Sequence, residues 1–358
     1  RAPGCGGGDQ AALAFRAVRR LLAGVGSFSR GLLELRPAAG AGGLGLFARR
    51  AVRPGELLVE LPLSRALWRE TADLSALGVE LPPGALLSEA ERIVLYLAVL
   101  RRQVAQREGV AGDFVEYARA LLASPVPNST LFWDVDELAW LQGTDAGELS
   151  AHYLSRVASI HAAAPLAAGL EELKAAFAQF TARHFRLWLG GSSFYPERVE
   201  AVLLPGVDLA RAREGGARPV FDARRRSVRL LAPAALRPGE ELFVDPGPRD
   251  LTDHLVALGA SGGPGAGVFL PVPLDSDANG GAKGRLLEQL QWPAEVRLLG
   301  DETRELRALR LAAMPREEFS AWSVGALAAG APLAVSRAFR TEVQATAYLL
   351  SECRRREA

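Results

Sequence analysis

The chain has 358 residues, which is enough for two or three domains that each bury a core. Its formal net charge of +1 gives no reason to expect nucleic acid as a partner, and a 49% hydrophobic content is ordinary for a soluble globular protein. Two cysteines near opposite ends and four histidines without ligand spacing predict neither a disulfide framework nor a metal site.

The N-terminal region has two interpretations. Its first fifty residues carry eight Arg but only Asp9 and Glu34 as acids, a composition typical of an organelle transit peptide. The alternative is a helix over 11–25 in an N-terminal arm, 1–25, and we favour it because apolar residues recur there at helical spacing. These residues are Leu13, Val18, Leu21 and Leu22. No apolar run of the chain approaches the ~18 residues of a membrane span, so we expect no membrane insertion.

Strands and helices then alternate in blocks. Two short strands are predicted over 44–51 and 57–63, joined by a Pro-Gly turn. From Ser88, which forms a capping-box pattern with Glu91, the periodicity becomes helical. Helices are predicted over 88–109, 113–124, 134–144, 150–163 and 170–189. Strands are predicted over 199–209, 219–224, 227–232 and 240–245.

The glycine-rich stretch 259–267 predicts a boundary. Beyond it the pattern is helical over 284–293, 302–330 and 336–356. The last of these segments carries one apolar stripe, made of Phe339, Val343, Ala347 and Leu350. The chain therefore consists of strand-rich pieces separated by a helical insert and followed by a helical appendix.

The triplet Gly43-Leu44-Gly45 is the candidate ligand-binding turn. A Rossmann fingerprint would open a helix after a strand, and a Walker loop would contain Gly-Lys followed by Ser or Thr. Here the glycines lead into a strand and a Pro-Gly turn, so neither phosphate site is predicted. On its own the triplet favours a tight turn between strands.

Four segments, in the right order, resemble the SET-domain proteins of the Rubisco large-subunit lysine methyltransferase group. They are 42–68, with its "GLGLFA" and "GELLVELP" patterns, 121–144, 236–245 and 268–353. The second segment is the most specific and keeps Phe132, Trp133, Glu137, Leu138, Leu141, Gln142, Gly143 and Thr144. We expect Phe132 and Trp133 to lie in the core.

The resemblance implies an α+β protein: a β-rich SET fold with a helical insert, followed by an all-α C-terminal domain of the substrate-binding type. The implied parts are the N-terminal arm 1–25, the first part of the SET core 26–68, the helical insert 69–175, the second part of the SET core 176–262 and the helical domain 263–358.

The resemblance also implies a reaction. S-adenosylmethionine would lie against Gly43, Leu44 and Gly45, and a neutral lysine amine would attack its sulfonium methyl group in line. In this group an Asn-His pair holds the cofactor, two tyrosines lie at the lysine channel and an arginine lies on the substrate side. The protein supplies positioning and aimed dipoles.

This sequence departs from the group at the positions that carry that chemistry. The arginine, the Asn-His pair and the two tyrosines are replaced by Ser192, Arg211, Ala212, Pro246 and Leu258. Ala260 replaces a phenylalanine, whereas Phe194, Pro205 and Asp208 match. Losing one aimed donor at a reacting centre typically costs ~10²–10³ in rate. A long cation at position 211 would also lie where the cationic cofactor belongs, if its side chain points inward.

We therefore predict no catalytic residue and no metal, with the glycine turn as the surviving part of a cofactor site. The leading hypothesis is a SET protein that has lost methyl transfer and acts as a protein-binding or scaffold subunit, through its insert or C-terminal domain, in the chloroplast or otherwise in the cytoplasm. An active lysine methyltransferase is the alternative, with Tyr195 or His254 supplying a hydroxyl or a base. A third hypothesis keeps S-adenosylmethionine as a structural ligand.

Overall fold

The chain forms two compact units, Arg1–Ala266 and Gly267–Ala358, each with its own hydrophobic core. The boundary lies inside the glycine-rich stretch in which the sequence predicts a break. The computed structural model describes residues 32–37, 44–106, 110, 112–189, 199–247, 249–260, 266–267, 269–274, 279–289, 295–297, 309, 311–317, 319–320, 345, 347–348 and 351.

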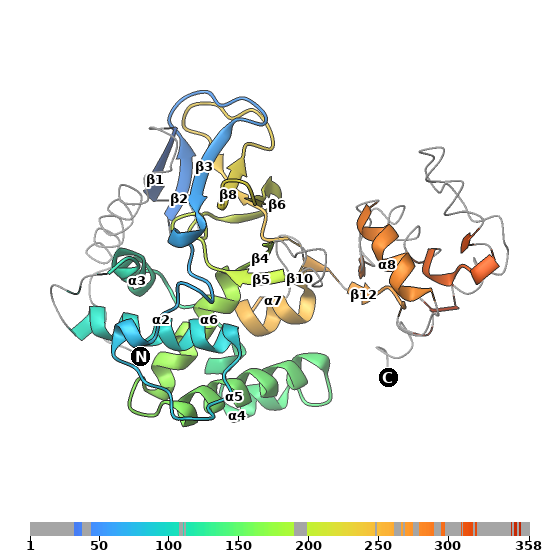
Figure 1. Ribbon diagram of the computed structural model, residues 1–358. Coiled ribbons are helices and arrows are strands. Elements are labelled where there is room, and N and C mark those ends of the chain that lie inside the picture. The colour runs from blue at the N-terminus through green and yellow to red at the C-terminus, as the bar shows by residue number, and fades with distance from the viewer. Residues whose placement is uncertain are drawn as a thin grey trace. The chain divides into compact units, whose positions relative to one another are not determined.

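The strands of the first unit lie in several small sheets rather than in one large sheet (Figure 1). One sheet has the order β1-β2-β9, and a second has the order β3-β8-β7. The strands β4 and β5 form a separate two-stranded sheet. The strands are β1 (Leu33–Pro37), β2 (Leu44–Ala48), β3 (Leu57–Pro62), β4 (Phe185–Trp188), β5 (Val199–Val202), β6 (Ala212–Ala217), β7 (Pro219–Asp222), β8 (Ser227–Leu231), β9 (Glu241–Leu242) and β10 (Arg249–Asp250).

Both strands predicted around the Pro-Gly turn are present, but they do not pair with each other. β2 pairs antiparallel with β1 and β9, whereas β3 pairs antiparallel with β8. Gly55, at a φ of +74°, takes the left-handed conformation that the turn requires. The turn therefore passes the chain from one sheet to the other. In β3 the buried residues Leu58, Val59 and Leu61 face the core of the unit.

Five helices form the insert and lie beneath the sheets in the view of Figure 1. They are α2 (Glu89–Gln106), α3 (Val115–Ala123), α4 (Val135–Ala139), α5 (Asp145–Ala163) and α6 (Leu170–Arg183), with the short 3-10 turn η4 (Thr130–Phe132) before α4. The expected capping box of α2 is present, since Ser88 N donates to Glu91 Oε2 at 2.7 Å and Glu91 N donates to Ser88 Oγ at 3.3 Å.

The helix predicted over 170–189 is wrong in its last part. α6 ends at Arg183, and Phe185–Trp188 form β4 instead. Phe185 and Leu187 are buried while Arg186 and Trp188 are exposed, which is the alternation of a half-buried strand. Pairing with β5 satisfies the backbone groups, so tertiary structure outweighs local helix propensity.

The sequence interpretation missed one helix, α7 (Leu251–Leu258). Asp250 caps its N-terminus by accepting a hydrogen bond from Thr252 N at 2.7 Å. Gly259 ends it in the left-handed conformation, at a φ of +65°. An aspartate nine residues before a glycine is a capping signal that was available in the sequence.

The second unit contains α8 (Gly280–Gln289) and, although it is predicted all-helical, a short antiparallel pair of β12 (Phe269–Pro271) and β13 (Glu295–Arg297). Lys283 of α8 is fully buried, and its ammonium donates to the carbonyls of Ala312 at 2.8 Å and Met314 at 2.7 Å. These bonds anchor α8 to the segment that contains both carbonyls.

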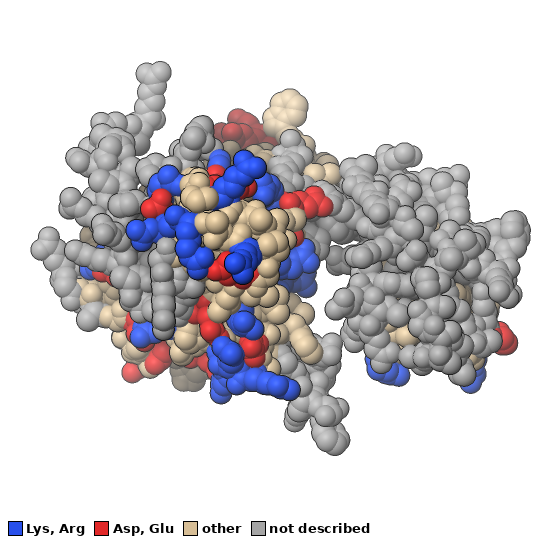
Figure 2. All heavy atoms as spheres, turned by 90° about the horizontal axis from the view of Figure 1, so that it is seen from above, with Lys and Arg blue, Asp and Glu red and all other residues tan. Residues whose placement is uncertain are grey.

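Charged side chains of both signs alternate over the described surface of the sheets (Figure 2). Many are paired: Arg50 with Glu56 at 2.9 Å and Arg225 with Glu60 at 3.4 Å. No helix within the described residues is both long enough and apolar enough to cross a membrane.

Candidate functional site

Gly45 is the part of the predicted cofactor turn whose surroundings the structure describes. Gly43 lies outside the described residues, and Leu44 begins β2, where its backbone pairs with Pro37. Gly45 is buried, and a Cβ atom added to it would lie 2.5 Å from Oε1 of Glu241. A larger residue would therefore have to displace this carboxylate, so the glycine serves packing whether or not a ligand binds.

Arg211 holds the Glu241 carboxylate in this position. Its Nε donates to Glu241 Oε1 at 2.7 Å and its Nη2 donates to Oε2, which makes a bidentate pair. The hydrogen bonding that Arg211 donates to Glu241 raises the pKa of Arg211 above its ordinary value. The Glu241 side chain is 9% exposed and therefore has little access to water. Within this pair the two charges cancel beside Gly45.

The backbone at position 211 is fixed as firmly as its side chain. Val244 N donates to Arg211 O at 3.0 Å, and Ala212 forms a parallel bridge with Val244. The guanidinium groups of Arg211 and Arg213 lie 5.3 Å and 4.1 Å from the ring centre of Phe243, within cation–π range. Arg211 thus lies near the glycine turn through its pairing with Glu241, and its side chain is 35% exposed.

Pro246, at the position of the first tyrosine, lies in a tight turn. Asp245 is buried and accepts a hydrogen bond from Gly247 N at 2.8 Å, which is an Asx turn. Gly247 has a φ of +87°, and a proline followed by such a glycine suits the two central positions of a type II turn. Arg218 Nη2 also donates to Asp245 at 2.9 Å. Pro246, which replaces the first tyrosine, therefore lies in a turn that Asp245 and Gly247 stabilise.

The insert segment 121–144 supports α7, which ends at the position of the second tyrosine, Leu258. Ser129 Oγ donates to the carbonyl of Val256 at 2.7 Å and satisfies an acceptor at the helix end. A Cβ at Gly259 would overlap the carbonyl oxygen of Asn128, so the two backbones touch. The match of segment 121–144 to the family pattern is therefore explained by its contacts with the end of α7.

The expectation that both aromatic residues of that segment lie in the core holds for one of them. Trp133 is half-buried and packs against the small apolar cluster of Leu141, Ala146 and Val256. Phe132 is 38% exposed, so its assignment to the core is wrong. It ends the 3-10 turn η4, whose inward position is taken by the buried Leu131.

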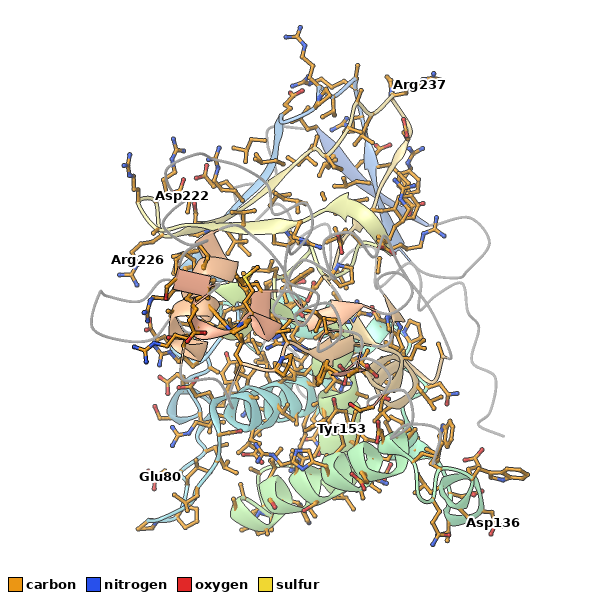
Figure 3. The ribbon with its side chains drawn as sticks, turned by 90° about the vertical axis from the view of Figure 1, so that its right-hand side faces the viewer. Glu80, Asp136, Tyr153, Asp222, Arg226 and Arg237 are labelled. Carbon is orange, nitrogen blue, oxygen red and sulfur yellow. The ribbon has the colours of Figure 1, made fainter. Side chains whose placement is uncertain are left out.

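A cavity of about 260 Å³ lies beside Pro246. It is lined by Tyr153, Thr181, His184, Arg186, Pro246, Asp253 and Ala257. Its walls thus come from α5, α6, β4 and α7, and they carry cationic and anionic side chains as well as a phenol. His184 Nδ1 lies 3.0 Å from the carbonyl of Phe180, which can only accept, so Nδ1 carries the hydrogen. Figure 3 shows Tyr153 within the helical layer of the first unit.

The structure describes only one of the two residues proposed to rescue catalysis. Tyr195 lies outside the described residues, as do Ser192 and Phe194. His254 is only 2% exposed, and it is not among the α7 residues that line the cavity, which are Asp253 and Ala257. Tyr153, from the insert, does line this cavity.

Asp208, which matches the SET pattern, is buried at the contact between the core and the insert. Tyr117 of α3 donates its hydroxyl to Oδ2, and Arg183 Nη1 donates to the Asp208 carbonyl at 2.9 Å. Oδ1 has no hydrogen-bond partner among the described atoms. Burial raises the pKa of Asp208 to about 7, against the opposing effects of the Arg183 charge and the Tyr117 hydrogen bond.

Sequence reasoning missed Glu241, Tyr153 and His184. Glu241 lies two residues before Phe243 in a recognised strand pattern, but only the fold brings it to Gly45, almost two hundred positions earlier in the chain. Tyr153 and His184 sit in helical sequence without any motif. No group of three or more His, Cys, Asp or Glu that could hold a metal occurs among the described residues.

Comparison with known proteins supplies the fold. No protein-family model and no curated protein sequence matches the chain. A crystal structure of the SET domain of LSMT bound to lysine and AdoHcy is 16% identical with a TM-score of 0.53, over 84% of this chain and 71% of that chain. A structure of Rubisco LSMT bound to AdoMet is also 16% identical with a TM-score of 0.53, over 85% and 72%. The chain thus has the predicted α+β fold, that of the Rubisco LSMT SET domain.

Proposed function

We propose that this chain is a SET-fold protein that has lost methyl transfer and acts by binding another protein. The observation that carries the proposal is the Arg211–Glu241 pair beside Gly45. In the family that this sequence resembles, the residue aligned with position 211 is the asparagine that holds the cofactor. A guanidinium fixed there opposes a sulfonium cation, and the carboxylate that could attract that cation is neutralised. These residues do not fit S-adenosylmethionine.

The remaining replacements support the same proposal. Neither Pro246 nor Leu258 has a hydroxyl to orient a lysine amine, and proline also lacks a backbone donor. Productive methyl transfer depends on a narrow range of approach geometries, so losses at several positions compound. The helical insert makes well-formed contacts with α7. It is the part of the chain that we propose to bind a partner.

A second candidate function is an active protein-lysine methyltransferase with rearranged site residues. The observation that favours it is the cavity beside Pro246, the position that the resemblance assigns to a tyrosine of the lysine channel. Tyr153 lines this cavity and would supply the hydroxyl that Pro246 lacks. Under this function, Tyr153→Phe abolishes a measurable methyl transfer while leaving the fold unchanged.

Calorimetric titration of the full chain with S-adenosylmethionine tests the proposal. We expect no saturable heat at millimolar cofactor for the natural chain. A matched pair of variants is available, because Arg211 and Arg213 both lie over Phe243 but only Arg211 pairs with Glu241. Binding that appears in Arg211→Asn but not in Arg213→Asn would identify the guanidinium as the blocking group. Saturable binding to the natural chain would contradict the proposal.

A further inference from the structure

The short helix α4 presents large apolar side chains to solvent. Trp140 is 86% exposed, Val135 is 83% exposed, and Phe132 lies just before them. The inner side of the same segment packs Trp133 and Leu138 against the cluster that supports α7. The exposed side chains are therefore not a sign of an unfolded end. We call Asp136 and Trp140, which lie one helical turn apart, the α4 surface.

The α4 surface is held rigidly. Asp134 Oδ1 accepts from Glu137 N at 2.8 Å and Glu137 Oε2 accepts from Asp134 N at 2.9 Å, which is a complete capping box. Thr144 Oγ1 donates to Leu141 O at 2.7 Å and accepts from Gly147 N at 3.1 Å at the start of α5. A partner would bind a preformed surface and lose little conformational freedom of α4 in doing so.

Charge along the chain on either side of the α4 surface has one sign. No Lys or Arg occurs between Arg119 and Arg156, whereas this interval contains Asp134, Asp136, Glu137, Asp145 and Glu148. The two bounding arginines are already engaged, Arg119 with Glu116 and Arg156 with Glu91 at 2.8 Å. Asp136 has no ion-pair partner in the described part of the chain, and Figure 3 places it at the outer edge of the helical layer.

Asp136 and Trp140 share one side of the helix. They are four residues apart, and Trp140 still has a helical conformation, with a φ of −66° and a ψ of −20°. A carboxylate beside a large aromatic ring is complementary to a side chain with a cation beside apolar groups. Tryptophan is also among the residues that contribute most to protein interfaces.

We propose that the α4 surface docks a basic amphipathic segment of a partner protein, with apolar side chains on Trp140 and Lys or Arg opposite Asp136. This inference rests on the protein-binding role proposed above but not on the loss of methyl transfer. The proposed partner of the insert is therefore a basic segment. Because Asp136 and the partner's Lys or Arg have opposite charges, docking should weaken as the salt concentration rises.

Panning a phage library of random 15-residue peptides on the immobilised full chain tests the docking. We expect enrichment of peptides that combine Lys or Arg with apolar residues, bound at least tenfold more weakly by Trp140→Ala and by Asp136→Lys. Trp188→Ala is the matched control, since Trp188 is also exposed, at 52%, but lies on β4. Both tryptophan variants should keep their thermal midpoints, because neither side chain is buried.

Several results would overturn the proposal. They are no enriched peptide, enrichment of acidic peptides, or binding that Trp140→Ala leaves unchanged. Protection of Trp140 from hydroxyl-radical oxidation in the free chain would show that the chain covers this surface itself. A dimer that dissociates in Trp140→Ala would make it a contact between copies. If these failures occur in a chain without methyl transfer, only the docking surface is wrong, and the proposed loss of activity stands.

Discussion

Replacing Asp208 by Asn should remove a pH dependence from the stability of the first unit. The carboxyl is buried and its pKa in the folded chain is about 7, against an ordinary value of 3.8. Below the ordinary value both states hold the proton. As pH rises toward 7 the unfolded chain loses its proton first, so the stability contributed by the protonated carboxyl declines and is gone above the folded pKa.

The size of this effect follows from the difference between the two pKa values. Each factor of ten in proton affinity is worth about 1.4 kcal/mol, so the decline between pH 4 and pH 8 should be on the order of 4 kcal/mol. Asparagine keeps an acceptor for the Tyr117 hydroxyl without carrying a charge. The stability of Asp208→Asn minus that of the natural chain should therefore grow as pH rises.

Urea unfolding of the full chain at several pH values, followed by far-ultraviolet circular dichroism, measures this difference. Asp136→Asn is the matched control, because that carboxylate is exposed on α4 and should change nothing beyond a few tenths of a kcal/mol. A difference between Asp208→Asn and the natural chain that stays constant from pH 4 to pH 8 would refute the reasoning.

Three further substitutions test packing. Gly45→Val should displace the Glu241 carboxylate and lower the free energy of unfolding by roughly 1–3 kcal/mol in urea titrations, and an unchanged midpoint would show that the contact yields freely. Ser129→Ala should cost about 1 kcal/mol and speed hydrogen exchange at the end of α7, and unaltered exchange there would refute its role as a cap. Lys283→Met should leave two carbonyls unpaired and lower stability by roughly 2–4 kcal/mol, seen as faster proteolysis of residues 267–358, whereas equal rates would argue against an anchoring role.

The sequence was most informative where local patterns and tertiary needs agree. The capping-box pattern of Ser88 and Glu91 correctly predicted the start of α2. The 121–144 segment and the glycine turn together correctly predicted the SET fold. Prediction failed over 185–188, where the pairing of β4 with β5 outweighs a helical context. It also left α7 unrecognised, because this helix is only eight residues long and its sequence signals are the caps at Asp250 and Gly259.

The candidate site could be predicted only in part. A gapless comparison with the family pattern predicts Arg211 at a cofactor position, and the structure pairs this residue with Glu241 beside Gly45. Its bidentate pairing with Glu241 was not predictable, because the two residues lie thirty positions apart, Arg211 just before β6 and Glu241 on β9, and only the tertiary fold brings them together. Tyr153 and His184 meet in one cavity only because α5 and α6 pack side by side.

Methyl transfer itself tests the central claim most directly. The full chain is incubated with methyl-labelled S-adenosylmethionine and a protein extract from its source, with the heat-denatured chain as the control. We predict that no lysine gains label above the control, because Arg211, Pro246 and Leu258 leave neither a cofactor site nor an oriented amine. Label on a lysine that depends on the folded chain, and is lost in Tyr153→Phe, would contradict the account and establish the enzyme.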